Sequence, residues 1–505
     1  MPLFTPAQRR LATHIAQLGH ANPFLPRRIE LEQAILEDAF IPGEPVWSVQ
    51  DVRGAESKNL DLLSRATRQL ADEARDRIAA GERITSSDAE LYADVALYCL
   101  FDRFRLKLHE VIEAAHQGEA STSVPFWEQF RQTADEYFAP GGNCLAVDYD
   151  RAHMLACFFQ LRRAFFHVFY FIVGRSPAAA RLRAAVWQSI FTHDLKRYQR
   201  SLYRHLGDVT TLITGPSGTG KELVARAIGL SRYTSFDPKQ EAFAESFASG
   251  FHPINLSALS PTLIESELFG HRRGAFTGAL ESRVGWLEMC PEQGVVFLDE
   301  IGELDTAIQV KLLRVLQTRT FQRLGETSDR RFQGKVLAAT NRDLVTEIQS
   351  GRFREDFYYR LCADHIETPS LREQLDECPD DIERLLLFIA RRVTPAEADC
   401  LAAEVAAWIN SHMNPYYAWP GNVRELEQCF RNVMIHGEYR PAAAPTAPDD
   451  DSWQSTVVAM EAGELTADQL VRQYCQLIYN RCGSYEQTAK RLGLDRRTVK
   501  KKLEQ

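Results

Sequence analysis

The first 173 residues carry apolar side chains at the spacing of an α-helix. One such run repeats every three or four residues: Leu63, Thr67, Leu70, Ala74 and Ile78. Gly81 is placed to end that helix, and Ser87 with Glu90 can form a capping box at the start of the next one. Asp150 can begin a third helix. This part of the chain is therefore predicted to be mainly helical.

The third predicted helix contains the most hydrophobic stretch of the chain, residues 155–173. Gln160, Arg162, Arg163 and His167 interrupt it, and the uninterrupted remainder is too short to cross a bilayer. A buried helix is therefore predicted rather than a membrane span. The stretch is also rich in aromatic rings. Rings at this density mostly fill a protein interior, and the alternative use is a ligand pocket or a partner groove.

Beyond residue 173 the pattern changes to short apolar runs separated by helical stretches. Three of these runs have the character of buried strands: 209–214, 295–298 and 336–339. Strands that alternate with helices predict a parallel sheet covered by helices, and hence an α/β fold. From about residue 366 to residue 437 the spacing becomes helical again.

Length and composition are those of a globular protein with more than one domain. The chain has 505 residues, of which 45% are hydrophobic and 25% are charged. Its formal net charge of −9 means that nucleic-acid binding would need a local basic patch. The ten cysteines are scattered without a Cys-x-x-Cys pair, which fits a reducing cytosol, and the N-terminus lacks the pattern of a secretory signal.

These patterns divide the chain into four predicted parts. Residues 1–173 form a helical domain, and residues 174–437 form an α/β domain whose last portion, about 366–437, is helical. Residues 438–462, which include a run of Pro, Ala and Asp, are predicted to be a flexible linker. Residues 463–505 form a short all-α domain that is basic at its end.

A glycine-rich loop lies between the first predicted strand and the helix that follows it. It consists of Gly215, Pro216, Ser217, Gly218, Thr219, Gly220 and Lys221. Glycines let backbone N–H groups surround an anion, the helix adds the positive end of its dipole, and Lys221 neutralises the β- and γ-phosphates. Glu222 stands where the general motif has a Ser or Thr for magnesium. The order of strand, loop and helix predicts an ATP site.

Two carboxylates follow the second predicted strand. One of Asp299 and Glu300 can hold a magnesium ion, directly or through water, and the other can orient or deprotonate the water that attacks the γ-phosphate. We assign the metal to Asp299 and the water to Glu300. With the phosphate loop, these acids predict an ATPase that uses ATP and Mg²⁺.

The stretch from about residue 174 to residue 437 resembles the sigma-54-dependent transcriptional activators, the bacterial enhancer-binding branch of the AAA+ ATPases. In that family Glu commonly follows the lysine of the phosphate loop, as Glu222 does here. The family's defining hexapeptide is present as Gly274, Ala275, Phe276, Thr277, Gly278 and Ala279. Residues 338–344 are similar to its sensor strand, and residues 419–426 to the signature of its helical lid. The resemblance implies a AAA+ domain that hydrolyses ATP in the cytoplasm and assembles from dimers into a hexameric ring.

The resemblance also implies how subunits and partners meet. Phe276 and Thr277 would touch the sigma factor when the hexapeptide loop lifts during the ATP cycle. Arg354 and Arg360 match the positions of arginine fingers, which reach the nucleotide of a neighbouring subunit. The implied partners are sigma-54 and RNA polymerase holoenzyme, upstream double-stranded DNA, and further copies of the chain, without a membrane.

Further roles within one subunit follow from the same resemblance. Arg424 matches the lid arginine that reads the γ-phosphate, and Asn255 matches the asparagine that holds the catalytic glutamate. Thr340 and Asn341 belong to the sensor strand. Residues 368–381 are longer than in the family's usual pattern, and we expect them to form a surface excursion.

The end of the chain is basic. Residues 481–505 carry a balance of +5 in a chain that is −9 overall. Helices at about 484–491 and after Asp495 predict a helix-turn-helix, similar to the Fis-type domain of this family. The side chains expected to face DNA are Arg496, Arg497, Thr498, Lys500 and Lys501. Upstream, Thr466 and Gln469 can cap a helix whose apolar stripe suits dimerisation. The alternative is a charged amphipathic tail.

Control of the ATPase is expected to come from residues 1–173, as a regulatory or sensory domain. They lack the pattern of acids and lysine of a phosphorylated receiver, so we expect a domain that binds a ligand or partner and restrains the ATPase. Its deletion should then raise basal activity. The competing possibility is that it builds the active assembly.

Two other functions remain open: a DNA-bound ATPase that never engages the sigma factor, and a AAA+ remodeller of another kind. The intact hexapeptide argues against the first, and the helix-turn-helix against the second.

Overall fold

The computed structural model describes residues 2–43, 58–82, 84–116, 123–139, 150–243, 250–441, 460, 466–482 and 485–504. They belong to two compact units of the chain, Met1–Met434 and Ile435–Gln505. The sheet, the helices around it and the helical lid belong to the first unit. Most of the predicted linker, 438–462, lies outside the described residues.

A five-stranded parallel sheet forms the centre of the first unit. Its order is β11 (Asp364–Glu367), β1 (Thr211–Thr214), β10 (Lys335–Thr340), β7 (Val295–Asp299) and β4 (Phe251–Asn255). The three predicted strands are β1, β7 and β10, and the predicted α/β fold is confirmed. Strands β4 and β11 lie at the two edges. Because β11 runs to Glu367, the helices of the lid begin later than the predicted residue 366.

Side chains of the central strands alternate between two hydrophobic cores, as the two-residue period of a strand requires. Ile213 and Leu337 enter the first core, whereas Leu212 and Val336 enter the second. The first core continues through the helices that precede residue 173. Among the described residues, the N-terminal helices and one face of the sheet therefore share one core across the predicted domain boundary.

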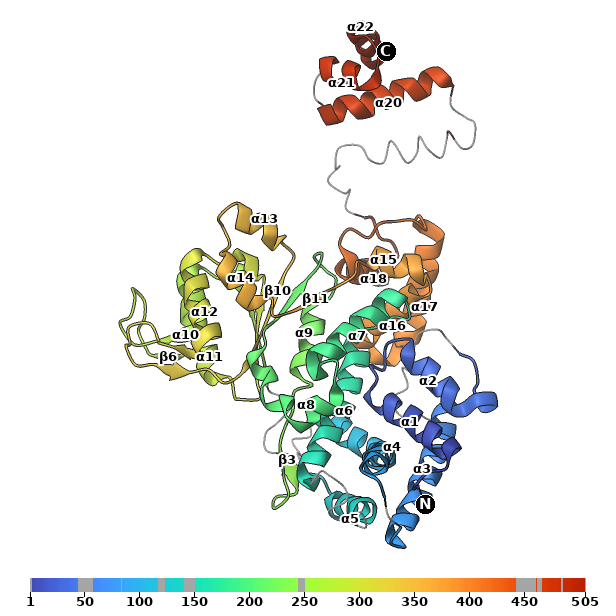
Figure 1. Ribbon diagram of the computed structural model, residues 1–505. Helices are drawn as coiled ribbons and strands as arrows, with labels where there is room; N and C mark the ends of the chain where they lie inside the picture. Colours follow the sequence, from blue (N-terminus) through green and yellow to red (C-terminus); the bar gives the residue numbers. More distant parts are fainter. Residues whose placement is uncertain are drawn as a thin grey trace. The chain divides into compact units, whose positions relative to one another are not determined.

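The helices of the N-terminal region confirm the helical prediction. They are α1 (Pro6–His20), α2 (Arg27–Leu36), α3 (Lys58–Ala79), α4 (Ser86–His116), α5 (Trp127–Phe138), α6 (Arg151–Phe171), α7 (Pro177–Phe191) and α8 (Leu195–Arg200), with short turns η1 (Glu37–Ala39), η3 (Leu202–Arg204) and η4 (Leu206–Asp208). Both α6 and α7 pack on α9 (Lys221–Gly229), the helix after the phosphate loop (Figure 1). In the described part of the chain, none of the helices is long and apolar enough to span a membrane.

Local signals place most helix ends. Gly81 follows α3 at a φ of 82°, and Asp150 caps the start of α6, both as predicted. The predicted cap of α4 is wrong. The hydroxyl of Thr85, not of Ser87, accepts a hydrogen bond from the Asp88 N–H at 3.1 Å. Thr85 lies directly before the first helical residue, where a hydroxyl can reach the free N–H groups of the first turn.

Smaller elements complete the two cores and the ends of the sheet. These are α10 (Pro261–Phe269), α11 (Trp286–Met289), α12 (Thr306–Thr318), α13 (Leu344–Gln349), α14 (Glu355–Leu361), η5 (Leu256–Ala258), η6 (Ile301–Glu303), and the two-stranded pairs β2 (Phe236–Asp237) with β3 (Ala242–Phe243), β5 (Gly270–His271) with β6 (Arg283–Val284), and β8 (Thr320–Phe321) with β9 (Arg330–Arg331). The β5–β6 pair carries the hexapeptide between its strands.

The lid consists of α15 (Leu371–Glu377), α16 (Asp381–Val393), η7 (Pro395–Glu397), α17 (Ala398–His412) and α18 (Asn422–His436). Its first part contradicts the expected surface excursion at 368–381, because Leu371 and Asp381 are fully buried. The Asp381 carboxylate accepts hydrogen bonds from the N–H groups of Arg175 (2.6 Å) and Ser176 (2.9 Å), where α7 begins. The lid therefore binds the segment that joins α6 to α7.

The second unit contains α20 (Ala467–Cys482), α21 (Tyr485–Leu492) and α22 (Arg496–Glu504), which pack on one another. The predicted capping box at Thr466 and Gln469 is present: the Thr466 N–H donates to the Gln469 amide oxygen at 2.9 Å, and the Gln469 N–H donates to the Thr466 hydroxyl at 3.4 Å. Asp495 caps α22 by accepting from the Thr498 N–H at 3.1 Å. The two predicted helices and the turn between them are thus formed.

Candidate nucleotide site

The phosphate loop turns sharply between β1 and α9. Gly215, Gly218 and Gly220 have φ angles of 142°, 80° and 88°, which favour glycine. A Cβ atom on Gly215 would lie 2.2 Å from the Thr368 hydroxyl, and one on Gly218 would lie 2.2 Å from the Gly421 carbonyl oxygen. Glycine at these two positions therefore permits the close approach of the lid segment to the loop.

Lys221 begins α9 and lies inside the loop. Its ammonium group donates to the carbonyl oxygens of Gly215 (3.0 Å) and Pro216 (3.1 Å). Burial lowers the pKa of Lys221, and the charges of Glu300 and Asp299 partly offset this effect. The lysine and the acid pair are therefore close enough to interact electrostatically, as the predicted site requires.

The acid pair stands at the carboxyl end of β7. Burial raises the pKa of Asp299, and the neighbouring charge of Glu300 raises it further. Glu300 has a left-handed backbone, with φ 57°, and its carboxylate accepts from the Asn341 N–H at 3.4 Å. A non-glycine residue in this conformation stores strain of the kind that is common at active sites. The pair is thus held in one place by the ends of two adjacent strands.

The acid pair fits a magnesium ion that is shared with a nucleotide. Across the described ranges, no group of three or more His, Cys, Asp or Glu side chains could hold a metal ion by itself. Mg²⁺ is usually bound by one or two carboxylates, water and the phosphates of its substrate. Two partly buried acids that line the same cleft as Lys221 match that requirement.

A cleft of about 440 Å³ brings most of the predicted nucleotide residues together. Predicted residues that line it are Ser217, Gly218, Gly220, Lys221, Glu222, Asp299, Glu300 and Arg424. Asn255, Thr340 and Asn341 stand at the ends of β4 and β10, beside the cleft rather than in its wall. The Asn255 amide oxygen accepts from the N–H and the hydroxyl of Ser257, at 3.0 and 2.8 Å, so its predicted hold on the glutamate remains a prediction.

The lid closes one side of the cleft through α18. The Val423 N–H donates to the Gly218 carbonyl at 3.0 Å, and the Arg424 guanidinium donates to the Ser217 hydroxyl at 3.0 Å. The Asn422 amide donates to the Ser217 carbonyl at 2.9 Å. Arg424 therefore stands at the phosphate loop, where a lid arginine could sense a phosphate.

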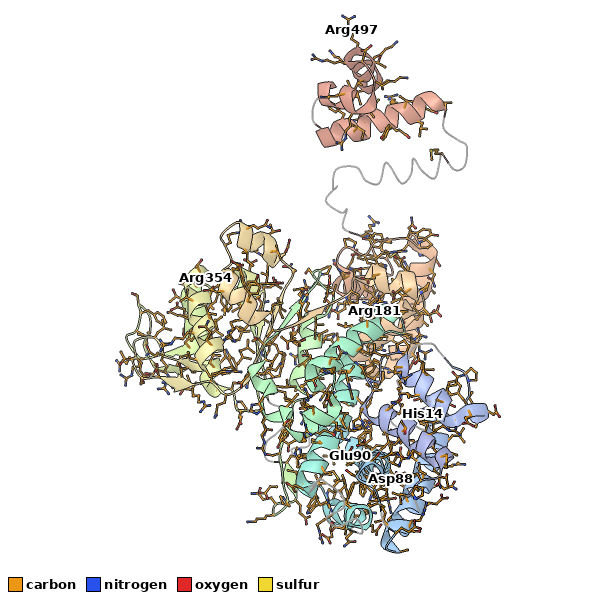
Figure 2. The ribbon with its side chains drawn as sticks, in the orientation of Figure 1. His14, Asp88, Glu90, Arg181, Arg354 and Arg497 are labelled. Atoms are coloured by element: carbon orange, nitrogen blue, oxygen red, sulfur yellow. The ribbon has the colours of Figure 1, made fainter. Side chains whose placement is uncertain are left out.

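The two predicted finger arginines lie elsewhere. Arg354 lies directly before α14 and forms an ion pair with Asp356 at 2.7 Å, and Arg360 is exposed near the end of the same helix. Figure 2 shows Arg354 at α14, well separated from Arg181 and the lid helices. Neither arginine lines the cleft of its own chain. Their position leaves them available to a second subunit.

The hexapeptide forms a closed turn beyond β5. The Gly274 N–H donates to the Ala279 carbonyl at 2.9 Å, and the Ala279 N–H donates to the Phe276 carbonyl at 3.0 Å. Thr277 is exposed, whereas the Phe276 ring lies edge-on to the His271 ring, with centroids 5.0 Å apart. The loop is therefore accessible at its tip and has its aromatic side chain folded back.

The basic side chains predicted to contact DNA belong to the second unit. Arg496, Arg497, Lys500 and Lys501 are exposed on α22, and Thr498 is partly buried. Val499 between them is fully buried and fixes which face of α22 points outward. The helix α22 therefore has one packed face and one basic face, and its contact with DNA remains a prediction.

Sequence reasoning missed several residues of the cleft. Tyr170 and Phe171 from the end of α6, and Phe388 from α16, line it. The Tyr170 and Phe388 rings meet edge-on, with centroids 6.4 Å apart. The sequence shows that these residues are aromatic. It does not show that they line the nucleotide cleft, because α6 and the lid come together only when the chain folds.

Comparisons with known proteins agree with the motifs. Residues 191–367 match the model of the sigma-54 interaction domain. Over 290 residues the chain is 41% identical to a Nif-specific regulatory protein of Azotobacter vinelandii, covering 56% of this chain and 48% of that protein. Over 316 residues it is 37% identical to the transcriptional regulatory protein ZraR of Klebsiella oxytoca, covering 59% and 63%. The predicted resemblance to sigma-54-dependent activators is confirmed over this region.

The match covers part of each protein. The chain spans about half the length of the curated relatives it matches first. Among solved structures, NtrX from Brucella abortus in complex with ATP aligns with 79% of this chain and 91% of its own, at 20% identity and a TM-score of 0.39.

Proposed function

We propose that this chain, whose residues 191–367 belong to the sigma-54 interaction domain family, hydrolyses ATP to remodel RNA polymerase holoenzyme that carries sigma-54. One observation carries the proposal: a cleft with a phosphate loop and an acid pair occurs in the same unit as an intact, exposed hexapeptide loop. The first feature provides hydrolysis, and the second provides a contact for the partner. The protein is thereby a transcriptional activator that opens promoter complexes.

Hydrolysis requires the acid pair and the loop to act on different atoms. Lys221 and the loop N–H groups bind the phosphates, Asp299 holds the magnesium ion, and Glu300 orients the attacking water. A magnesium ion held there would neutralise the developing charge on the phosphates. Arg424 reads the γ-phosphate within the subunit, which couples the nucleotide state to the lid.

A ring of subunits completes the site. Arg354 and Arg360 are assigned to the nucleotide of a neighbouring subunit, because they lie outside the cleft of their own chain. The active species is then a hexamer built from dimers. The exposed Val471 and Tyr474 on α20 are suited to the dimer contact.

DNA binding by residues 463–505 keeps the ATPase near its promoter. Arg496, Arg497, Thr498, Lys500 and Lys501 contact upstream double-stranded DNA, with α22 in the major groove. The arrangement implies a cytoplasmic protein that needs no membrane. Residues 1–173 act as the regulatory domain.

In-vitro transcription from a sigma-54 promoter tests the proposal. The full chain should give open complexes with ATP but not with a non-hydrolysable analogue. ATP hydrolysis and DNA binding without open complexes would favour the alternative of a DNA-bound ATPase that never engages sigma-54. Hydrolysis without DNA binding would favour a AAA+ remodeller of another kind.

A further inference from the structure

A second cavity, of about 150 Å³, lies among the N-terminal helices. Its wall is mostly apolar and includes Leu97, Phe101, Phe158, Leu161, Phe165 and Trp187. These side chains come from α4, α6 and α7. An apolar cavity of this volume is large enough for one benzene ring.

The aromatic side chains of the wall already pack in the geometry that rings prefer. Phe101 and Phe158 meet edge-on with centroids 5.5 Å apart, and Phe165 and Trp187 are tilted with centroids 4.7 Å apart. A further ring could add to this cluster by the same edge and face contacts. The apolar part of the cavity therefore favours an aromatic ligand over an extended aliphatic one.

Cationic groups outnumber anionic groups in the wall. Three arginines line the cavity, Arg28, Arg105 and Arg162, against two aspartates, Asp94 and Asp102. Arg105 pairs with Asp102 at 3.1 Å. Arg28 forms its ion pair outside the wall, with Glu32 at 2.8 Å, and Asp94 is paired with Lys196 at 3.1 Å.

Arg28 and Arg162 are the buried members of this set, with 7% and 8% of their surfaces exposed, and Arg162 comes from α6. Burial lowers the pKa of Arg162 to about 10; the charge of Arg105 lowers it further, and Glu113 partly offsets this. Arg105 and Arg162 both line the cavity, and two guanidinium groups that face one apolar cavity favour an anion between them.

We propose that this cavity binds a small aromatic carboxylate, with the ring among Phe101, Phe158 and Phe165 and the carboxylate toward Arg162 and Arg105. The apolar wall selects a single ring by its volume, and the guanidinium groups select the negative charge. The cavity is thus a ligand site of the N-terminal region, separate from the nucleotide cleft.

The helix α6 connects the two sites. Phe158, Leu161 and Phe165 line the cavity, whereas Tyr170 and Phe171, at the end of the same helix, line the nucleotide cleft. A ligand that favours one position of α6 must therefore change nucleotide affinity, and the nucleotide must change ligand affinity by the same factor. This coupling rests on the proposed function, whereas the ligand site does not.

Titration calorimetry of the full chain with benzoate, benzyl alcohol and benzylamine tests the ligand class without any variant. We expect benzoate to bind at least tenfold more tightly than benzyl alcohol, and benzylamine to bind most weakly. Tightest binding of benzylamine, or no heat from any of the three at millimolar concentration, would overturn the assignment.

Variants then locate the site. Arg162→Met should remove the preference for benzoate, and Leu97→Trp should fill the cavity and abolish binding of all three compounds. Arg103→Met and Leu106→Trp are the matched controls, because they replace exposed residues of α4. Both variants should bind the three compounds as the unmodified chain does. Near-ultraviolet circular dichroism checks that each variant is folded. Benzoate binding unchanged by a folded Leu97→Trp chain would place the ligand elsewhere.

Coupling is measured with a fluorescent ATP analogue. Saturating benzoate should change the dissociation constant of the ATP analogue at least threefold. Saturating nucleotide should change the dissociation constant of benzoate by the same factor. If both ligands bind and neither constant changes, coupling through α6 is refuted. If benzoate binds and the nucleotide does not, the proposed function fails while the ligand site stands.

Discussion

Asn422 joins the lid to the phosphate loop through both ends of its side-chain amide. The amide nitrogen donates to the Ser217 carbonyl at 2.9 Å, and the amide oxygen accepts from the Leu371 N–H at 2.8 Å. Asn422 is 4% exposed and has a φ of 52°, a conformation that asparagine tolerates better than alanine. Replacing Asn422 with Ala, Gly or Asp therefore separates three contributions: the hydrogen bond to Ser217, the hydrogen bond from Leu371, and the left-handed backbone.

The expected costs differ between the three replacements. A buried N–H that loses its acceptor costs about 1–3 kcal/mol, and a left-handed alanine costs about 1–2 kcal/mol more. Asn422→Gly should be destabilised only by the loss of the acceptor. Asn422→Ala should be destabilised by that loss and by the left-handed backbone as well. Asn422→Asp keeps an acceptor for the Leu371 N–H, but it replaces the donor to the Ser217 carbonyl with a carboxylate oxygen, so it loses that contact and adds repulsion there.

Hydrogen exchange of the Leu371 amide reports this bond directly. Because 1.4 kcal/mol corresponds to a factor of ten, a loss of about 2 kcal/mol should speed exchange by about 30-fold in Asn422→Gly, and more in Asn422→Ala. Asn422→Asp should stay closest to the unmodified chain. Asn432→Ala, on the same helix, is the matched control, since the Asn432 amide donates to Gln428 of its own helix. Unchanged exchange in the Gly and Ala variants would refute the reasoning.

Four further predictions test other parts of the proposal. Lys221→Ala should weaken nucleotide binding at least tenfold, whereas Glu300→Gln should bind nucleotide and lose at least 100-fold in turnover. Equal loss of nucleotide binding by both variants in an equilibrium titration would contradict the roles assigned to Lys221 and Glu300. Mixed rings of Arg360→Ala and Glu300→Gln subunits should recover part of the ATPase activity, and its absence in rings shown to co-assemble would refute a finger that acts between subunits. Thr277→Ala should keep ATP hydrolysis within about twofold of the unmodified chain and abolish sigma-54 transcription, since the exposed tip does not line the nucleotide cleft. Normal transcription would contradict the role of the hexapeptide. Deleting residues 1–173 should expose the shared core and yield an aggregating or strongly destabilised chain in thermal melts, and a soluble, active fragment would contradict that.

Strong local patterns made much of the fold predictable. The central strands are buried on both faces, so their sequences are continuous apolar runs, and the phosphate loop has glycines where the backbone requires them. The edge strands β4 and β11 were not predicted because their sequences lack such a continuous apolar run. Residues 251–255 and 364–367 contain His, Pro, Asp and Glu, which an edge strand tolerates because one of its sides has no neighbouring strand.

Contacts between distant segments could not be predicted from local patterns. The lid segment at 368–381 looked like a surface insertion, yet the Asp381 carboxylate is fully buried because it binds the N–H groups at the start of α7. Tyr170 reaches the nucleotide cleft only because α6 packs along α9. Such residues carry no signal of their own, since their environment is created by the tertiary fold.

The shared core limits how the N-terminal region could control the ATPase. Side chains of the sheet and of α9 in this core include Ile213, Val224, Ile228, Val295, Phe297, Leu337 and Ile366. Exposing a buried side chain of this size costs about 1.5–3 kcal/mol, so uncovering the set would cost about 10–20 kcal/mol.

Direct hydrogen bonds add to that cost. The Arg163 guanidinium on α6 donates to the carbonyl oxygens of Leu230 and Arg232, just beyond α9, at 2.5–3.0 Å. A ligand present at a thousand times its dissociation constant supplies only about 4 kcal/mol. Even if α7 kept half of the core covered, that ligand could not detach the N-terminal helices. Restraint by a removable domain is therefore the less favourable form of control, and a small displacement of α6, which needs no loss of the core, is the form that a ligand can drive.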